Sequence, residues 1–235
     1  MPMRKMVLTF AIMIVPLALL GNSQAAFGGI KLKDYPKSSK LKESLNLNSP
    51  NQLGEIFILP TERFDEAEAS NMISRVDNLP PSLLTKIEDE DITVKLFVGK
   101  LTDNPTAQHL EGVIPRGYTG DITWDDVPGI GGSKTVLVKI GYSEKGKGHG
   151  SVNLELHELA HSVDRFVYNG IRFNQKFLGV WKAEKAKLFP GKDYFLTFPE
   201  EYFAEVFAMY FAGAESRKIL RQNAPETYDF IKNLK

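Results

Sequence analysis

The sequence contains no cysteine among its 235 residues. Disulfide bonds, cysteine nucleophiles and thiolate metal ligands are therefore excluded, so a folded form must rely on its hydrophobic core for stability. The chain also lacks an excess of either charge, because 29 basic side chains balance 29 acidic ones. Nucleic acids and anionic membranes bind proteins through clustered Lys and Arg, so we expect neither as a partner.

A long apolar run occurs only at the N-terminus, where Arg4 and Lys5 precede residues 6–20 and a small residue follows at Ala26. This order of features is typical of a secretory signal peptide. The run is shorter than the roughly 20 residues that a transmembrane helix needs. We therefore expect residues 1–26 to be cleaved and the mature chain to be secreted, with no membrane contact afterwards.

The first part of the mature chain predicts a leader followed by a small sheet. Residues 27–52 are rich in Lys, Ser and Asn with little apolar periodicity, so we expect them to form an exposed leader. Apolar or alternating runs at 55–59, 92–98 and 135–140 predict short strands.

Helices account for most of the remaining pattern. Helical spacing appears at 64–76 and throughout the chain after residue 150, whereas turn residues dominate 110–134. We predict a single α+β domain over residues 53–235. Its N-terminal lobe, about 53–168, would contain a small mixed, twisted sheet with helices, and its C-terminal lobe, about 169–235, would be helical, with a cleft between the lobes.

The residues from His157 to His161 spell His-Glu-Leu-Ala-His. Two imidazoles four residues apart lie on one helical face, about one turn apart, so both can bind one zinc ion. Glu158 lies beside such an ion, where it can accept a proton from water as a general base. The alternative is an ordinary amphipathic helix with two surface histidines. The other histidines, His109 and His149, lie in turn-rich segments and are expected at the surface.

A catalytic zinc site needs a third protein ligand and an open coordination position. The segment from Pro199 to Phe211 offers carboxylates on a helix that is apolar almost all round. A glutamate buried in such a helix is unfavourable unless a metal or hydrogen-bond donors compensate it. Glu201 and Glu205 share one face, so one of them could bind zinc while the other orients a histidine. Glu200 also suits the simpler role of complementing the helix dipole.

Two segments carry patterns far more specific than the histidine pair, Thr-Trp-Asp-Asp-Val-Pro-Gly at 123–129 and Asn-Leu-Glu-Leu-His-Glu at 153–158. With Gly-Lys-Leu-Thr-Asp at 99–103, Gly-Lys-Gly-His at 146–149 and the Pro-Glu-Glu helix start at 199–201, they resemble the Pro-Pro endopeptidases. This family comprises secreted bacterial zinc peptidases related to the catalytic domain of anthrax lethal factor. The similarity covers nearly the whole mature chain.

The resemblance implies a zincin-like metallopeptidase fold that binds one Zn²⁺ per chain. It implies Glu201 as the third ligand and Tyr194 as the side chain that supports the oxyanion, a role that a phenol donor can perform. The residues alone leave aromatic packing as an equal alternative for Tyr194. Glu205 and Asp164, one turn beyond His161, are candidates to orient the site from behind the ligands.

The resemblance also implies a proline-rich protein substrate, in particular a bacterial surface protein, that is cut between two prolines. Because proline lacks an N–H, affinity should come from shape and apolar contact. Trp124 corresponds to the tryptophan that contacts substrate in the family, with a buried core position as the alternative. Glu200 and the loop containing Gly132, Ser133 and Lys134 complete the expected substrate contacts, and this loop lies where family members differ.

We therefore predict a secreted, monomeric zinc endopeptidase that hydrolyses Pro-Pro bonds. One alternative is a zinc peptidase of the same fold with another target, such as a toxin-like protease that acts on a host protein. The other is a module that binds proline-rich ligands without cutting them.

Overall fold

The computed structural model describes residues 28–116 and 121–234. The predicted signal peptide at 1–26 lies outside these residues. Within the described part of the chain, no helix has the length and apolar character needed to cross a bilayer.

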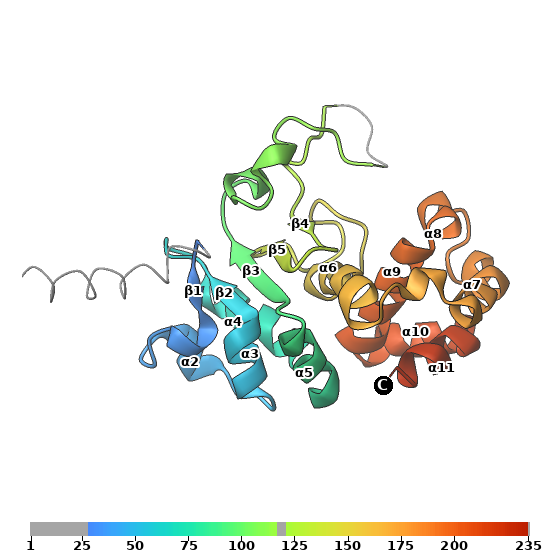
Figure 1. Cartoon of the computed structure of the whole chain (residues 1–235), viewed down its shortest axis with the longest axis horizontal. Coiled ribbons are helices and arrows are strands. Elements are labelled where there is room, and N and C mark those ends of the chain that lie inside the picture. Colours follow the sequence, from blue (N-terminus) through green and yellow to red (C-terminus); the bar gives the residue numbers. More distant parts are fainter. Residues whose placement is uncertain (1–27, 117–120, 235) are drawn as a thin grey trace, which may run out of the picture.

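A five-stranded mixed sheet forms the centre of the N-terminal half (Figure 1). Its three inner strands run parallel, and its two edge strands run antiparallel to their neighbours. The small mixed sheet predicted from the sequence is confirmed. In spatial order, the strands are β1 (Ile30–Lys31), β2 (Phe57–Leu59), β3 (Thr93–Phe97), β5 (Thr135–Lys139) and β4 (Gly129–Ile130).

Four helices lie beside this sheet, near β1 to β3 in Figure 1. Apolar residues at helical spacing bury one face of each longer helix, as Ile73 and Val76 do in the third of them. The side chain of Asp65 caps that helix by accepting hydrogen bonds from the backbone N–H groups of Ala67 and Glu68. The four helices are α2 (Lys40–Ser44), α3 (Pro50–Ile56), α4 (Glu66–Val76) and α5 (Pro81–Asp89).

The prediction of an exposed leader at 27–52 is wrong for residues 28–52. Ile30 pairs with Leu59 across β1 and β2, so this segment contributes an edge strand to the sheet. Leu32 and Leu41 are 1% and 0% exposed. Single apolar residues among polar ones produce no periodic pattern, and for this reason the sequence suggested an exposed leader. Helix α3 also continues through Ile56, which shortens the strand predicted at 55–59.

The C-terminal half is helical, as predicted. Its central helix, α9, is buried on nearly all sides, and Phe203 and Phe207 are fully enclosed. Helix α6 packs directly on α9 and joins the same hydrophobic core. Carboxylates on the face of α9 toward α6 can therefore meet the side chains of α6. The helices are α6 (Leu154–Ser162), α7 (Gln175–Leu188), α8 (Asp193–Thr197), α9 (Pro199–Ala212), α10 (Ala214–Asn223) and α11 (Pro225–Lys232).

Candidate metal centre

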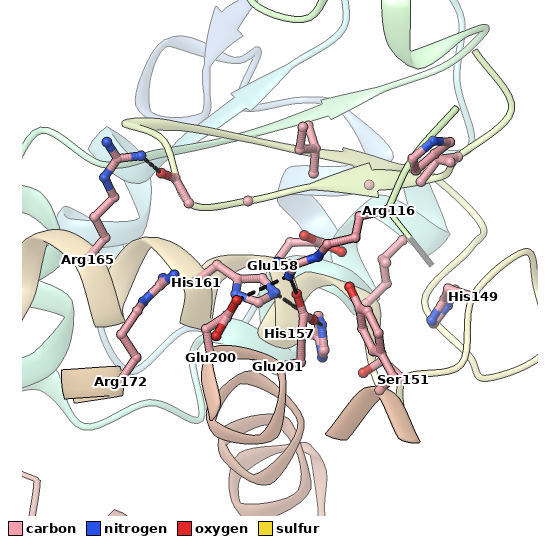
Figure 2. A pocket seen from close by; sticks show the side chains of 18 of the residues that line it. Arg116, His149, Ser151, His157, Glu158, His161, Arg165, Arg172, Glu200 and Glu201 are labelled. Carbon is pink, nitrogen blue, oxygen red and sulfur yellow. Dashed lines mark hydrogen bonds and ion pairs between the residues drawn. The ribbon is translucent and has the colours of Figure 1, made fainter. Parts of the chain in front are cut away.

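A cleft of about 860 Å³ opens between edge strand β4 and the helices α6 and α9 (Figure 2). The Asn153 side chain caps α6 by accepting a hydrogen bond from the N–H of Leu156 at 3.0 Å, which fixes where the helix begins. The residues of α6 and α9 that line the cleft are Leu154, His157, Glu158, His161, Glu200 and Glu201.

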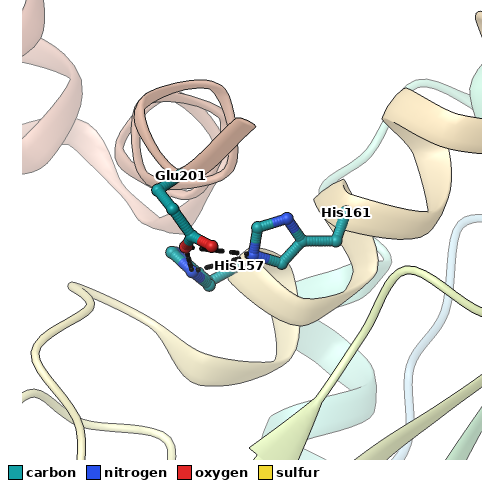
Figure 3. A group of neighbouring side chains, drawn as sticks. All are labelled: His157, His161 and Glu201. Atoms are coloured by element: carbon teal, nitrogen blue, oxygen red, sulfur yellow. Dashed lines mark hydrogen bonds and ion pairs between the residues drawn. The ribbon is translucent and has the colours of Figure 1, made fainter. Parts of the chain in front are cut away.

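Three side chains converge in the cleft from two helices (Figure 3). His157 Nε2 and His161 Nε2 lie 3.3 Å apart. Glu201 Oε2 lies 3.5 Å from His157 Nε2 and 3.4 Å from His161 Nε2. The predicted set of ligands therefore comes together in space, and the three residues could hold a metal ion.

The spacing of these three atoms matches a tetrahedral site. Zinc binds nitrogen and carboxylate oxygen at about 2.0–2.2 Å, so two ligands of one tetrahedron lie about 3.3–3.5 Å apart. The observed separations of 3.3, 3.4 and 3.5 Å fall in that range. Two imidazoles and one carboxylate are also a donor set that zinc accepts at catalytic sites.

Glu205 supports the centre from one turn further along α9. Its Oε2 accepts a hydrogen bond from His157 Nδ1 at 3.1 Å, so the Nε2 of that ring faces the other two ligands. Its Oε1 accepts from the N–H of Val152 at 2.9 Å. The helical pattern alone left Glu201 and Glu205 interchangeable, and the family resemblance implied Glu201 as the ligand. The geometry agrees, since it brings Glu201 into the ligand set and leaves Glu205 in the supporting position.

The carboxylates dominate the electrostatics of the centre. Burial by itself would lower the pKa of His157, but hydrogen bonds to Glu201 and Glu205 outweigh it and raise that pKa to about 10. Burial would likewise raise the pKa of Glu201, but the two imidazoles hold it far below its usual range. The site therefore keeps its carboxylates ionised and ready to bind a cation.

Glu158 lies where the edge of the sheet comes closest to α6. A Cβ atom on Gly129 would lie 3.0 Å from Glu158 Cγ, and one on Gly131 would lie 1.9 Å from the Glu158 carbonyl oxygen. Only glycine permits this approach at position 131, because the obstacle is rigid backbone. The two glycines thus allow β4 to form one wall of the cleft directly beside the predicted base.

Tyr194, at the start of α8, also lines the cleft. Its ring lies 5.9 Å from the guanidinium carbon of Arg116, and its phenol lies close enough to Glu201 to feel the charge of that carboxylate. Burial raises the pKa of this phenol, with a further contribution from the charge of Glu201. The ring also packs against Phe195 and Phe198, so the packing role and the polar role occur together. A phenol that stays protonated is a suitable donor to negative charge that develops in the cleft.

Sequence and structural comparisons agree with this geometry. Residues 42–234 match the family model described as anthrax toxin lethal factor, N- and C-terminal domain. The chain is 38% identical to a Pro-Pro endopeptidase of Clostridioides difficile (strain 630) over 204 residues, which cover 86% of this chain and 92% of the relative. It is 39% identical to a Pro-Pro endopeptidase of Paenibacillus alvei over 183 residues, 77% of this chain and 84% of the relative.

This chain belongs to the Pro-Pro endopeptidase family. The solved structure of the Paenibacillus alvei enzyme aligns with a TM-score of 0.75 at 38% identity and covers 79% of this chain and 100% of that one. The predicted α+β fold and the predicted class of enzyme, an endopeptidase, are confirmed. The alternatives of a toxin-like protease and of a binding module are not favoured.

Within this family fold, Trp124 lines the cleft and also packs against a small apolar cluster with Leu137 and Ile130. Its loop is fixed by Asp125, which accepts hydrogen bonds from the Gly112 N–H at 2.8 Å and from two threonine hydroxyls. These bonds lower the pKa of Asp125 to about 2. Trp124 is therefore held rigidly at the cleft edge, as its predicted substrate contact requires.

The loop predicted to contact substrate is brought only partly to the cleft. Gly132 lines it, whereas Ser133 Oγ turns to the carbonyl oxygen of Thr135 at 2.5 Å. Lys134 Nζ contacts the carboxylate of Glu90 at 2.9 Å. In this structure, Ser133 contacts neighbouring backbone and Lys134 contacts Glu90 just after α5, so the contact of these two side chains with substrate stays a prediction.

Asp164 and His149 also differ from expectation. Asp164 is fully buried and binds Arg172, not the metal ligands, so it does not orient the centre directly. His149 lines the cleft and is half-buried, with Nε2 donating to the Tyr142 carbonyl oxygen at 2.7 Å. His109 is exposed, as predicted. The turn-rich sequence around His149 gave no indication that this loop lies beside the start of α6.

Three arginines in the cleft were not foreseen. Arg116 contacts Glu200 at 3.2 Å and Glu201 at 3.0 Å, which gives Glu200 a role at the cleft rim. Arg165 and Arg172 line the end of the cleft beyond the second histidine. For Arg165 and Arg172, the only feature of the sequence that could have suggested a place in the cleft was their position, four and eleven residues after His161.

Proposed function

We propose that this protein is a zinc endopeptidase that hydrolyses Pro-Pro bonds in proline-rich proteins. The observation that carries the proposal is the tetrahedral spacing of His157 Nε2, His161 Nε2 and Glu201 Oε2. The names of the two relatives, both Pro-Pro endopeptidases, support the choice of bond.

The protein's own residues divide the work of hydrolysis. What a bound zinc ion supplies is Lewis acidity, which polarises the scissile carbonyl and makes water a stronger nucleophile. Glu158 accepts the proton from the attacking water and passes it to the departing proline nitrogen. Tyr194 donates a hydrogen bond to the carbonyl oxygen as its negative charge grows. Trp124 offers an apolar face to a peptide whose prolines cannot donate backbone hydrogen bonds.

Replacement of the base tests the chemistry. Glu158→Gln should retain one zinc per chain and lose at least about 10²–10⁴-fold in turnover, because the amide cannot accept the proton. Glu215→Gln, on the exposed side of α10, makes the same change away from the cleft and should retain turnover. Zinc content by elemental analysis and cleavage by mass spectrometry give both readouts, and full activity of Glu158→Gln would refute the assignment.

A peptide library tests the bond. Peptides with a fixed Pro-Pro core and varied flanks, together with matched peptides in which either proline is alanine, should be cut only between two prolines. Chelation of the metal should abolish this cleavage, and added zinc should restore it. Cleavage of the alanine peptides at equal rates would contradict the substrate class.

We further propose that the chain is secreted after cleavage near Ala26, acts as a monomer and cuts bacterial surface proteins. Expression of the full chain in an exporting bacterium should release protein whose N-terminus lies near residues 26–27. Protein that stays in the cells with residues 1–26 still attached would contradict secretion. Sedimentation of the purified protein tests the oligomeric state.

A further inference from the structure

Two arginine side chains line the end of the cleft beyond His161 (Figure 2). In the same view, His149 and Ser151 lie at the opposite end, with the metal ligands between. The cleft therefore has two chemically different ends. Arg165 and Arg172 form one of them, which we name the arginine end.

Asp164 holds Arg172 in a fixed position. Its Oδ2 accepts from the Nε and Nη2 of Arg172, both at 2.5 Å, and its Oδ1 accepts from the Arg172 backbone N–H at 3.0 Å. The carboxylate of Asp164 is fully buried. A guanidinium has five N–H donors, so this pairing leaves other donors of Arg172 for a ligand. The side chain is therefore pre-organised at the cleft wall, with its planar group fixed.

The backbone between these residues is built to return Arg172 to the cleft. After α6 the chain forms a single π-helical turn at Val163–Val167. Asn169 and Gly170 then adopt positive φ angles of 52° and 93°, and the Gly170 N–H donates to the Asp164 carbonyl oxygen at 2.7 Å. Such turns and left-handed residues occur often at functional sites. Here they reverse the chain within a few residues.

Unlike Arg172, Arg165 has a positive charge that is not paired with a carboxylate. Its Nη1 donates to the Gly132 carbonyl oxygen at 2.9 Å, and its guanidinium lies over Phe166. Neither contact is an anion, and among the described residues no carboxylate pairs with Arg165 within 4.0 Å. Two guanidinium groups and the single carboxylate of Asp164 leave the arginine end with one net positive charge. Arg116, by contrast, is paired with Glu200 and Glu201.

The free edge of β4 sets the direction in which a peptide would meet this charge. The chain runs from Gly129, beside Glu158, to Gly132, beside His161. Antiparallel pairing is the commoner arrangement between strands. A peptide that pairs with β4 in this way runs opposite to it, from the side of His161 toward the side of Glu158, so residues before the cleaved bond lie at the arginine end.

We propose that the arginine end is a subsite for a carboxylate side chain, Asp or Glu, located two to four residues before the cleaved bond. The inference rests on the proposed peptidase function and adds a charge preference to it. Paired guanidinium donors match the two oxygens of a carboxylate. Because Arg165 is exposed, water weakens the attraction, and we expect about a tenfold preference for Asp over Lys in kcat/KM.

Charge reversal in enzyme and peptide tests the proposal. The peptides share a Pro-Pro core and carry Asp, Asn or Lys at one position, either two to four residues before the bond or at mirrored positions after it. Wild-type enzyme should prefer Asp to Asn to Lys before the bond, and Arg165→Lys should retain that order. Arg165→Glu should reverse it. Lys218→Glu, an equal charge change on exposed α10, should keep the wild-type order. The preference should shrink as salt rises, because the site is open to solvent.

Different failures point to different parts of the account. If no Pro-Pro peptide is cut, the proposed function fails before the subsite is tested. If all peptides are cut but wild type does not distinguish Asp from Lys, the subsite is refuted. The subsite is also refuted if Arg165→Glu keeps the wild-type order of Asp, Asn and Lys. It is refuted as well if acidic residues are preferred only at positions after the cleaved bond. Thermal unfolding of each variant ensures that these comparisons use folded protein, and Arg165→Gln, which removes the charge without reversing it, should abolish the preference.

Discussion

Glu205 Oε2 lies 3.1 Å from His157 Nδ1, while the other oxygen of the same carboxylate accepts the backbone N–H of Val152 at 2.9 Å. One side chain on α9 therefore fixes both the metal-binding imidazole and the backbone just before α6. This contact explains why a glutamate is buried a full turn inside an apolar helix. It also links metal binding to the packing of α6 on α9.

Glu205→Ala should weaken zinc binding by about 10–100-fold, because His157 loses the acceptor that orients its ring. Competition with a chromophoric chelator measures the affinity. Glu200→Ala, on the same helix but paired with Arg116, serves as the matched control and should retain the affinity. Equal zinc affinity in Glu205→Ala and wild type would show that the hydrogen bond does not support the metal.

Gly131→Ala should destabilise the protein by about 1–3 kcal/mol and lower turnover, because the new Cβ meets the rigid carbonyl of Glu158. Edge strand β4 would have to move away from α6 to accommodate it. Gly179→Ala is the matched control, since no atom lies within 4 Å of its Cβ position in α7. That change should stabilise the helix by about 0.5–1 kcal/mol. Chemical denaturation compares the two, and an unchanged stability of Gly131→Ala would contradict the close approach.

Tyr194→Phe should keep the fold and the zinc but lower kcat by about 10²–10³-fold, because the ring still packs while the donor to the carbonyl oxygen is lost. KM should change less than kcat, since the hydrogen bond strengthens mainly as charge develops. Steady-state kinetics on a Pro-Pro peptide provides the comparison. A variant with normal kcat would leave Tyr194 with its aromatic packing alone.

Metal uptake should release about one proton from His157 near pH 7, because zinc binds the neutral imidazole. The carboxylates of Glu201 and Glu205 raise the pKa of that residue from 6.5 to about 10 in the metal-free protein. This raised pKa stabilises the metal-free fold fully below pH 6.5, and the stabilisation is lost as pH rises toward 10. Apparent zinc affinity should therefore increase over the same range.

Calorimetry in two buffers with different heats of ionisation counts the released protons. Thermal unfolding of the chelated protein between pH 7 and 10 follows the loss of stability. Zinc uptake without proton release at pH 7 would contradict the protonated state assigned to His157.

The sequence identified those parts of the centre that depend on local spacing. His157 and His161 are one helical turn apart, so their shared face follows from the period of the helix. Glu201 is distant in sequence, yet an acidic residue in an apolar helix marked it as a candidate. The family resemblance then separated it from Glu205, and the 3.1 Å contact of Glu205 with His157 gives the physical reason.

Features that depend on irregular backbone or distant partners could not be predicted. Asp164 binds Arg172 and not the metal ligands, because the left-handed residues Asn169 and Gly170 reverse the chain and bring Arg172 next to Asp164. Lys134 pairs with Glu90, which lies far earlier in the chain, just after the end of α5. Leu32 and Leu41 anchor a segment that resembled a leader because single buried residues leave no periodic pattern.

The central claim is that His157, His161 and Glu201 hold one zinc ion together. Anomalous diffraction at the zinc edge from crystals of the protein locates that ion most directly. The account predicts one strong peak per chain, at about 2.0–2.2 Å from His157 Nε2, His161 Nε2 and a Glu201 oxygen. A peak bound elsewhere, or one bound by the histidines with Glu201 turned away, would contradict it.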